Sequence, residues 1–214
     1  MLVKERMSTP VISVAPDLPI MEALSLMRRE QIRRTPVMKN GKMVGIVSEK
    51  DLLDASPSDA TSLSVWEISY LLSRVPVSDV MTKDVFTLEE DTPIEEAAMI
   101  MVDNKLGGLP VVRGKAVVGL ITETDLFKCF LELMGARELG VRVTAIVIDE
   151  PGVLASISNA ITDAGGNFIS FGTFSGQDLA HREIVFKVSD IDRNDVLEVV
   201  TPLVERIVDI RDCC

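Results

Sequence analysis

The sequence of 214 residues has few aromatic side chains (4%), three cysteines, a single histidine and no long apolar run. Because His181 is the only histidine, Ser-His-Asp or Cys-His catalysis has little support. The cysteines, two of them adjacent at the end, form no disulfide framework and indicate a reducing compartment. The longest apolar run, 97–102, falls far short of the roughly 18–20 residues that span a bilayer. No apolar signal segment follows Met1, so we expect a cytoplasmic protein without a membrane association.

Motifs for enzymatic chemistry are also missing. The sequence holds no Walker A motif, no Rossmann fingerprint, and no His-x-x-x-His or Cys-x-x-Cys spacing. We therefore predict no catalytic residues, no metal and no cofactor. A net charge of −11 disfavours nucleic-acid binding, which needs a basic surface. Residues 1–53 nevertheless carry nine basic and six acidic groups, and the cluster of Arg28, Arg29, Arg33 and Arg34 suits one small anion.

An internal repeat organises the first two thirds of the chain. Residues 7–53 align with 81–127 at a constant offset of 74, and 15 of the 47 pairs are identical. Repeats of this kind indicate paired units that cannot bury a core alone. The identical residues in the first copy are Met7, Val11, Asp17, Pro19, Ile20, Glu22, Ala23, Met27, Pro36, Val37, Val44, Gly45, Glu49, Asp51 and Leu52.

Each copy predicts the order β-α-β-β-α. Pro19 and Pro93 suit the first position of a helix, and Thr92 with Glu95 predicts a capping box in the second copy. The Asn40-Gly41 pair is a strong hairpin signal. The expected extended segments are 11–14, 35–38 and 43–47 in copy one, and 85–88, 109–112 and 117–121 in copy two. Between the copies we expect a loop over 56–64 and a short helix over 65–72, with Trp66 and Tyr70 in a core or interface.

From Val141 onward the pattern changes to β-α-β-β-α-β, the ferredoxin-like order. Strands are expected over 141–148, 167–174, 182–188 and 207–211, with helices over 153–164 and 192–206. Gly165-Gly166 should end the first helix, and Pro202 should kink or break the second.

Two family resemblances follow from these motifs. The ending Gly-h-h-Ser/Thr-x-x-Asp, where h is apolar, resembles the CBS motif, and its two copies resemble a CBS pair, or Bateman module. Asp-x-Pro-Gly-x-Leu before a helix, with a later Gly-Gly-Asn, resembles the ACT domain. The whole chain is similar to AcuB-type acetoin-utilisation proteins. The resulting α/β (α+β) organisation is CBS motif 1 over 1–62, a linker helix over 63–74, CBS motif 2 over 75–137 and an ACT domain over 138–214.

The pairs Ser48/Asp51 and Thr122/Asp125 have two interpretations. Ser/Thr-x-x-Asp is close to a helix capping box, which would make both pairs structural. An ionised carboxylate is also a suitable acceptor for ribose hydroxyls, and the CBS resemblance implies contacts to adenine nucleotides at these positions. The resemblance favours a nucleotide at Asp51 and leaves both interpretations open at Asp125.

The resemblance implies further nucleotide-binding residues. Arg33 and Arg34 stand where basic residues meet phosphates in the family, while copy two has Gly107-Gly108 there. CBS pockets borrow the opening strand of the partner copy, so Thr82 and Val85 should complete the Asp51 site, and Ser8 and Val11 the Asp125 site. The remaining candidates are Thr35, Pro36, Gly108, Leu109 and Pro110.

In the last third, the resemblance points to Asp149, Gly152 and Asn167 as ligand contacts. A glycine at a helix N-terminus allows close approach of a carboxylate, as in ACT domains that hold an amino acid. Alternatively, Pro151-Gly152 is only a turn and Asn167 only adopts a left-handed backbone, and Asp149 with Glu150 would repel a carboxylate.

Together these inferences predict a non-catalytic, cytoplasmic regulatory protein. It would bind AMP, ADP or ATP in the CBS pair as a regulatory ligand, act as a homodimer, and control an enzyme or transporter that the sequence does not name. The alternatives are an interaction module with structural CBS units that senses only an amino acid at the ACT interface, and a component of acetoin utilisation.

Overall fold

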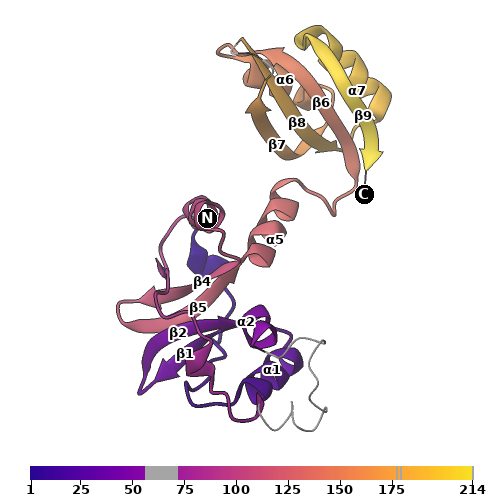
Figure 1. The fold of residues 1–214 in the computed structure, drawn as a ribbon. Coiled ribbons are helices and arrows are strands. Elements are labelled where there is room, and N and C mark those ends of the chain that lie inside the picture. Colours follow the sequence, from indigo (N-terminus) through magenta and orange to yellow (C-terminus); the bar gives the residue numbers. More distant parts are fainter. Residues whose placement is uncertain (56–71, 177, 179, 214) are drawn as a thin grey trace. The chain divides into compact units, whose positions relative to one another are not determined.

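The protein is described by a computed structural model that covers residues 1–55, 72–176, 178 and 180–213 (Figure 1). The expected loop over 56–64 and most of the expected linker helix, with Trp66 and Tyr70, lie outside these residues. The chain forms two compact units, Met1–Leu126 and Phe127–Cys214. In the described ranges, no helix has the length and apolar character required to cross a membrane.

The first unit contains both copies of the repeat. Copy one has α1 (Ile20–Arg29), β1 (Arg34–Lys39), β2 (Lys42–Ser48) and α2 (Glu49–Asp54). Copy two has β3 (Leu88–Glu89), α4 (Ile94–Asn104), β4 (Gly108–Arg113), β5 (Ala116–Thr122) and the start of α5 (Glu123–Leu133). The predicted hairpins β1–β2 and β4–β5 are antiparallel, with a register shift at the same place in each copy. Asn40 and Gly41 both have positive φ, as the hairpin signal requires.

The helix starts differ from the sequence predictions. Pro19 and Pro93 are N-cap residues with extended ψ, not first helical residues, because their carbonyls accept the first intrahelical bonds. The capping box expected from Thr92 and Glu95 is also wrong, since α4 has no side-chain cap. The first opening segment, 11–14, forms only a single bridge between Val14 and Val37.

The two copies exchange their opening segments. The 3-10 turn η1 (Val3–Glu5) places Val3, which is 0% exposed, in the core of copy two. At the equivalent position 74 residues later, the turn η2 (Val77–Asp79) places Val77, also 0% exposed, in the core of copy one. Each copy is therefore completed by residues that precede the other.

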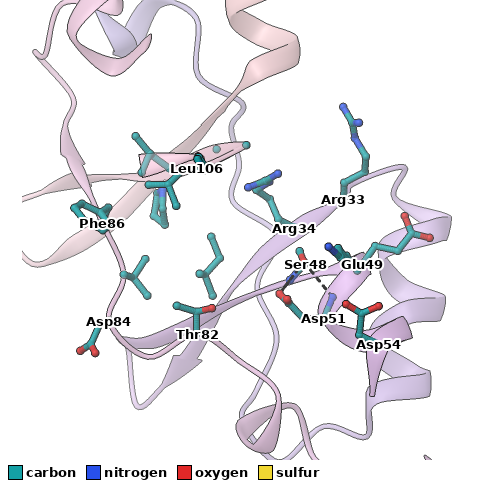
Figure 2. Close-up of a pocket in the computed structure, with 18 of the residues that line it drawn as sticks. Arg33, Arg34, Ser48, Glu49, Asp51, Asp54, Thr82, Asp84, Phe86 and Leu106 are labelled. Atoms are coloured by element: carbon teal, nitrogen blue, oxygen red, sulfur yellow. Dashed lines mark hydrogen bonds between the residues drawn. The ribbon is translucent and has the colours of Figure 1, made fainter. Parts of the chain in front are cut away.

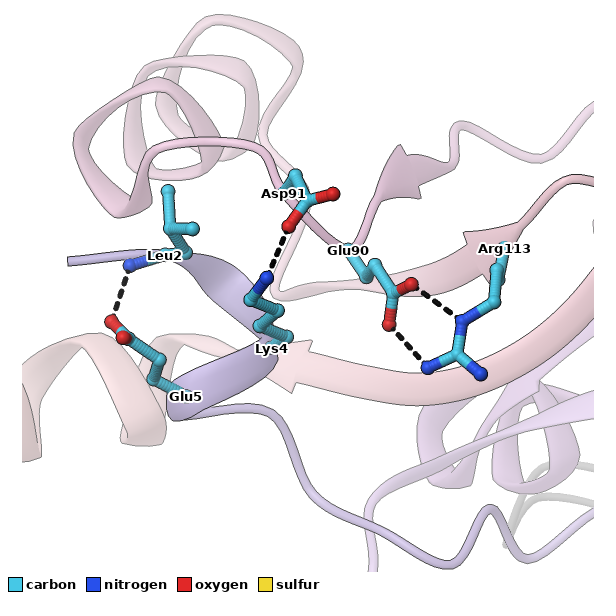
Figure 3. A network of polar contacts seen from close by, with 6 residues as sticks. All are labelled: Leu2, Lys4, Glu5, Glu90, Asp91 and Arg113. Atoms are coloured by element: carbon cyan, nitrogen blue, oxygen red, sulfur yellow. Dashed lines mark hydrogen bonds and ion pairs between the residues drawn. The ribbon is translucent and has the colours of Figure 1, made fainter.

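Polar contacts hold the first exchanged segment in place (Figure 3). The Lys4 ammonium lies 2.5 Å from Oδ1 of Asp91, and the Lys4 amide donates to the carbonyl of Glu90 over 2.9 Å. Both oxygens of Glu90 then accept from the guanidinium of Arg113. Residues 3–5 thus belong structurally to the second copy.

The second unit has the predicted ferredoxin-like order. Its elements are β6 (Gly140–Ile148), α6 (Val153–Asp163), β7 (Asn167–Ser175), β8 (His181–Ser189), α7 (Arg193–Val200), η3 (Thr201–Leu203) and β9 (Arg206–Cys213). The sheet is antiparallel with the order β7-β8-β6-β9, and a core around Phe186 lies between it and the two helices. Pro202 does end the last helix, but α7 stops at Val200, six residues before the expected end, because the chain then turns into η3.

Candidate functional site

A pocket of about 580 Å³ lies between the two copies of the first unit. Copy one contributes residues from the start of β1, from β2 and from α2, and copy two contributes residues 82–86 and 105–110. Figure 2 shows Arg33 and Arg34 on one side, the Ser48–Asp51 pair below them, and Phe86 with Leu106 across the pocket. The pocket therefore offers cations, a carboxylate and apolar surface in separate places.

Asp51 combines the two interpretations that the sequence leaves open. Its Oδ2 accepts from the Ser48 amide (2.8 Å) and hydroxyl (2.7 Å), and the Ser48 Oγ accepts from the Asp51 amide, so the capping box is present. These contacts use Oδ2 alone. The residue also lines the pocket and is only partly buried. A capping role thus leaves Oδ1 available to accept from a ligand hydroxyl.

The two arginines lie in different surroundings. Arg33 is exposed, and its Nη2 donates to the hydroxyl of Thr124 over 2.8 Å. Arg34 is half-buried against Gly107 and Gly108. Burial is the largest influence on Arg34 and lowers its pKa. The negative charge of Glu123 opposes this shift in pKa, and the positive charge of the neighbouring Arg33 acts with it. The guanidinium stays charged, but it has lost part of its hydration.

The structure brings segments from copy two to the Asp51 pocket. Thr82 and Val85 line it, and Thr82 is held by a pair of 2.9 Å backbone hydrogen bonds to Ile46. Gly108, Leu109 and Pro110 line it as well. Sequence reasoning missed several lining residues because they carry no motif, although the 74-residue offset combined with segment exchange could have located them. They include Phe86, Lys105 and Leu106.

Thr35 and Pro36 do not line this pocket. Thr35 is 0% exposed, and its hydroxyl donates to the carbonyl of Ile12 over 2.6 Å. Pro36 is buried beside it, and its carbonyl accepts from the Val14 amide. The strand alternation that aims Arg34 at the pocket turns Thr35 to the opposite face. Pro36 shares the face of Arg34 by this alternation but is buried and does not line the pocket.

The equivalent region of copy two is more enclosed. Oδ2 of Asp125 accepts from the Thr122 amide (3.0 Å) and hydroxyl (2.7 Å), in the same arrangement as Asp51. The Asp125 side chain is buried, however, and its residue is only 7% exposed. Ser8 pairs with Leu120 through two backbone hydrogen bonds, as Thr82 pairs with Ile46. Val11 lies in the extended segment after Ser8 and is partly buried.

The candidate ligand residues of the second unit do not come together within one chain. Asp149 and Gly152 follow the end of β6 that pairs with His181, whereas Asn167 pairs with Ser189 at the other end of β8. Eight residues of strand separate the two ends by roughly 26 Å.

The local roles of these residues are nevertheless clear. Gly152 is the N-cap of α6 with φ of 97°, a conformation that favours glycine. Asp149 is held by Arg182 at 2.8 Å. Asn167 begins β7 without a left-handed backbone, so that alternative is wrong. Among the described residues, no group of three His, Cys, Asp or Glu side chains is placed to hold a metal ion.

Comparison with known proteins agrees with the architecture of the first unit. The model for the CBS domain matches residues 3–58 and 77–132, slightly more than half of the chain. The uncharacterized protein MJ1426 of Methanocaldococcus jannaschii is 32% identical over 155 residues, which are 61% of this chain and 92% of the relative. An inosine-5′-monophosphate dehydrogenase of Thermoplasma acidophilum is 35% identical, but the match covers 54% of this chain and only 21% of the enzyme.

Solved structures resemble the same part of the chain. The CBS domain pair of protein MJ0100, in complex with 5′-methylthioadenosine and S-adenosyl-L-methionine, has a TM-score of 0.52 at 28% identity and covers 64% of this chain and 98% of its own. A putative acetoin utilization protein (AcuB) from Vibrio cholerae reaches 0.53 at 30% identity, over 64% and 95%. CBSX2 from Arabidopsis thaliana in complex with AMP reaches 0.50 at 26% identity, over 61% and 96%.

Proposed function

Because this chain belongs to the CBS-domain family, we propose that it is a non-catalytic regulatory protein that binds an adenine nucleotide in the Asp51 pocket. The observation that carries the proposal is the pocket itself, which combines apolar surface, an available carboxylate oxygen and two arginines. The adenosine ligands named for MJ0100 and CBSX2 support the same ligand class.

Each part of a nucleotide has a complementary part of the pocket. Phe86 and Leu106 offer apolar surface to the adenine ring. Oδ1 of Asp51 accepts from a ribose hydroxyl, and the guanidinium groups of Arg33 and Arg34 suit the phosphate oxygens. A ligand that bridges both copies would favour one packing of the pair over others, and regulation by population shift follows from that preference.

The second unit is proposed to be an ACT domain. Its ferredoxin-like sheet order and the Asp149-x-Pro-Gly turn support this assignment. An amino-acid site made by Asp149, Gly152 and Asn167 would need a second copy of the chain, because one chain holds these residues at opposite ends of the sheet. The proposed homodimer is tested by sedimentation velocity with and without amino acids.

Calorimetric titration of AMP and ATP tests the nucleotide proposal. The proteins are wild type, Asp51→Ala and the matched variant Asp125→Ala, which removes the same capping interaction from the more enclosed copy. We expect wild type and Asp125→Ala to bind, and Asp51→Ala to lose binding at least tenfold. Absence of binding by wild type at millimolar nucleotide would leave both aspartates as helix caps and overturn the proposal. Nucleotide turnover would contradict the non-catalytic part.

A further inference from the structure

The positive charge of Arg34 is not balanced by a contacting acid. Within the described residues Arg34 makes no ion pair, although the charges of Glu123 and Asp51 act on it without a direct contact. The side chain is half-buried, so water compensates its charge incompletely. A partly dehydrated guanidinium without a carboxylate partner gains from a bound anion and is repelled by a bound cation.

Two glycines give Arg34 its position. A Cβ on Gly107 would lie 3.0 Å from Cζ of Arg34, and one on Gly108 would lie 2.9 Å from its Cδ. The Arg34 side chain therefore occupies space that any other residue at these two positions would fill. We call Gly107 and Gly108 the diglycine seat. The equivalent positions of copy one are Arg33 and Arg34 themselves, so the seat exists in only one copy.

Among the described residues, the acids of the pocket form no ion pair with Arg34. Glu49 interacts with Arg28 at 3.4 Å, outside the seat. Figure 2 shows Asp54 and Asp84 away from Arg34, on other sides of the pocket. Arg33 and Arg34 are therefore neighbouring cations on this wall, and the acidic charges that act on Arg34, those of Glu123 and Asp51, do so without forming an ion pair with it.

We propose that Arg34 on its diglycine seat selects adenosine ligands by the charge of the 5′ substituent. Nucleoside phosphates bind, whereas adenosine derivatives with a positive 5′ sulfonium group are excluded. The inference rests on the proposed function, because it concerns the same pocket. The solved relatives hold ligands of both kinds, AMP in CBSX2 and S-adenosyl-L-methionine in MJ0100. The fold therefore accommodates either ligand, and we attribute the choice between them to the side chains that line the pocket.

Three ligands that share adenosine test the proposal by calorimetric titration. AMP is anionic, 5′-methylthioadenosine is neutral, and S-adenosyl-L-methionine carries the sulfonium. We expect wild type to bind AMP at least tenfold tighter than 5′-methylthioadenosine, and S-adenosyl-L-methionine to bind most weakly, because charge-assisted hydrogen bonds are the stronger kind. Arg34→Gln should reduce AMP affinity about tenfold and leave 5′-methylthioadenosine affinity unchanged.

Three further variants separate charge from structure. Arg34→Lys should preserve the ranking of the three ligand affinities, because lysine keeps the positive charge. Gly107→Ala should lower the ratio of AMP to 5′-methylthioadenosine affinity, because it displaces Arg34 without removing it. Arg29→Gln is the matched control, since it changes the net charge equally at an exposed residue outside the pocket. Unchanged binding of the neutral ligand shows that each variant has folded.

The outcomes distinguish this inference from the proposed function. Equal affinity of wild type for all three ligands would overturn charge selection and leave the adenosine site standing. An unchanged affinity ratio in Arg34→Gln would show that Arg34 is not the selecting residue. If none of the ligands binds at millimolar concentration, both the inference and the proposed function fail.

Discussion

The close approach between β2 and the exchanged segment of copy two makes Gly45 a sensitive position. A Cβ at Gly45 would lie 2.8 Å from the backbone carbonyl oxygen of Thr82 and 2.6 Å from Sδ of Met81. The same Thr82 carbonyl accepts from the Ile46 amide over 2.9 Å, so the backbone cannot retreat without weakening this hydrogen bond. Steric exclusion of a Cβ atom thus explains why Gly45 begins the Gly-h-h-Ser/Thr-x-x-Asp motif of copy one.

Gly45→Ala should therefore destabilise the first unit and disturb the pocket. Overpacking against backbone, with a weakened hydrogen bond, should cost about 2 kcal/mol of unfolding free energy. For a unit of this size, such a loss lowers the unfolding midpoint by roughly 6–10 °C. Thr82 and Val85 line the pocket, so their displacement should also weaken AMP binding.

The matched control is Gly119→Ala, 74 residues later. There the three nearest atoms all belong to the side chain of Met7, which is flexible enough to move aside. Differential scanning calorimetry and AMP titration are applied to both variants. We expect less than half the loss of stability in Gly119→Ala, and wild-type affinity for AMP. An unfolding midpoint of Gly45→Ala within 1 °C of wild type would refute the steric argument.

Three other predictions concern named polar contacts. Asp51→Ala and Asp125→Ala should each lose about 1–2 kcal/mol of unfolding free energy in urea, since both remove a cap. An unfolding free energy of Asp125→Ala equal to that of wild type would contradict the capping role. The hydrogen bond that His181 Nδ1 donates to the Asp178 carboxylate raises the pKa of His181 above its usual value of 6.5. The stabilisation from this pair is therefore fully present below pH 6.5 and is lost as the pH rises through the raised pKa. An NMR titration measures that pKa, and the pH dependence should disappear in His181→Gln. Lys187→Met should cost about 1–3 kcal/mol in denaturant unfolding, because a buried ammonium that bonds two backbone carbonyls is removed; wild-type stability would refute this.

Much of the architecture could be predicted because the repeat fixes its own alignment. The constant offset located both hairpins, and the Asn40-Gly41 turn has the positive φ values that its residue types indicate. Helix ends were less predictable. Pro19 satisfies either the N-cap or the first helical position, and only tertiary hydrogen bonding selects between them.

The candidate site was predicted in part. Ser48, Asp51 and the two arginines lie at one pocket, together with Thr82 and Val85. Thr35 could not be placed from adjacency to Arg34, because successive strand residues face opposite sides. The burial of Pro36 depends on tertiary packing, which the motif does not record. Phe86 and Leu106 reach the pocket through contacts between the copies, which a one-dimensional motif does not record.

Segment exchange also bears on how such a protein could have arisen. Since Val3 fills the core of copy two and Val77 that of copy one, a single copy lacks part of its interior. Two identical short chains could supply the missing parts to each other as a swapped dimer. Joining them end to end would raise the effective concentration of each partner and make assembly independent of dilution. The fused halves could then diverge, and an arginine pair facing a glycine pair is an asymmetry that an identical dimer cannot have.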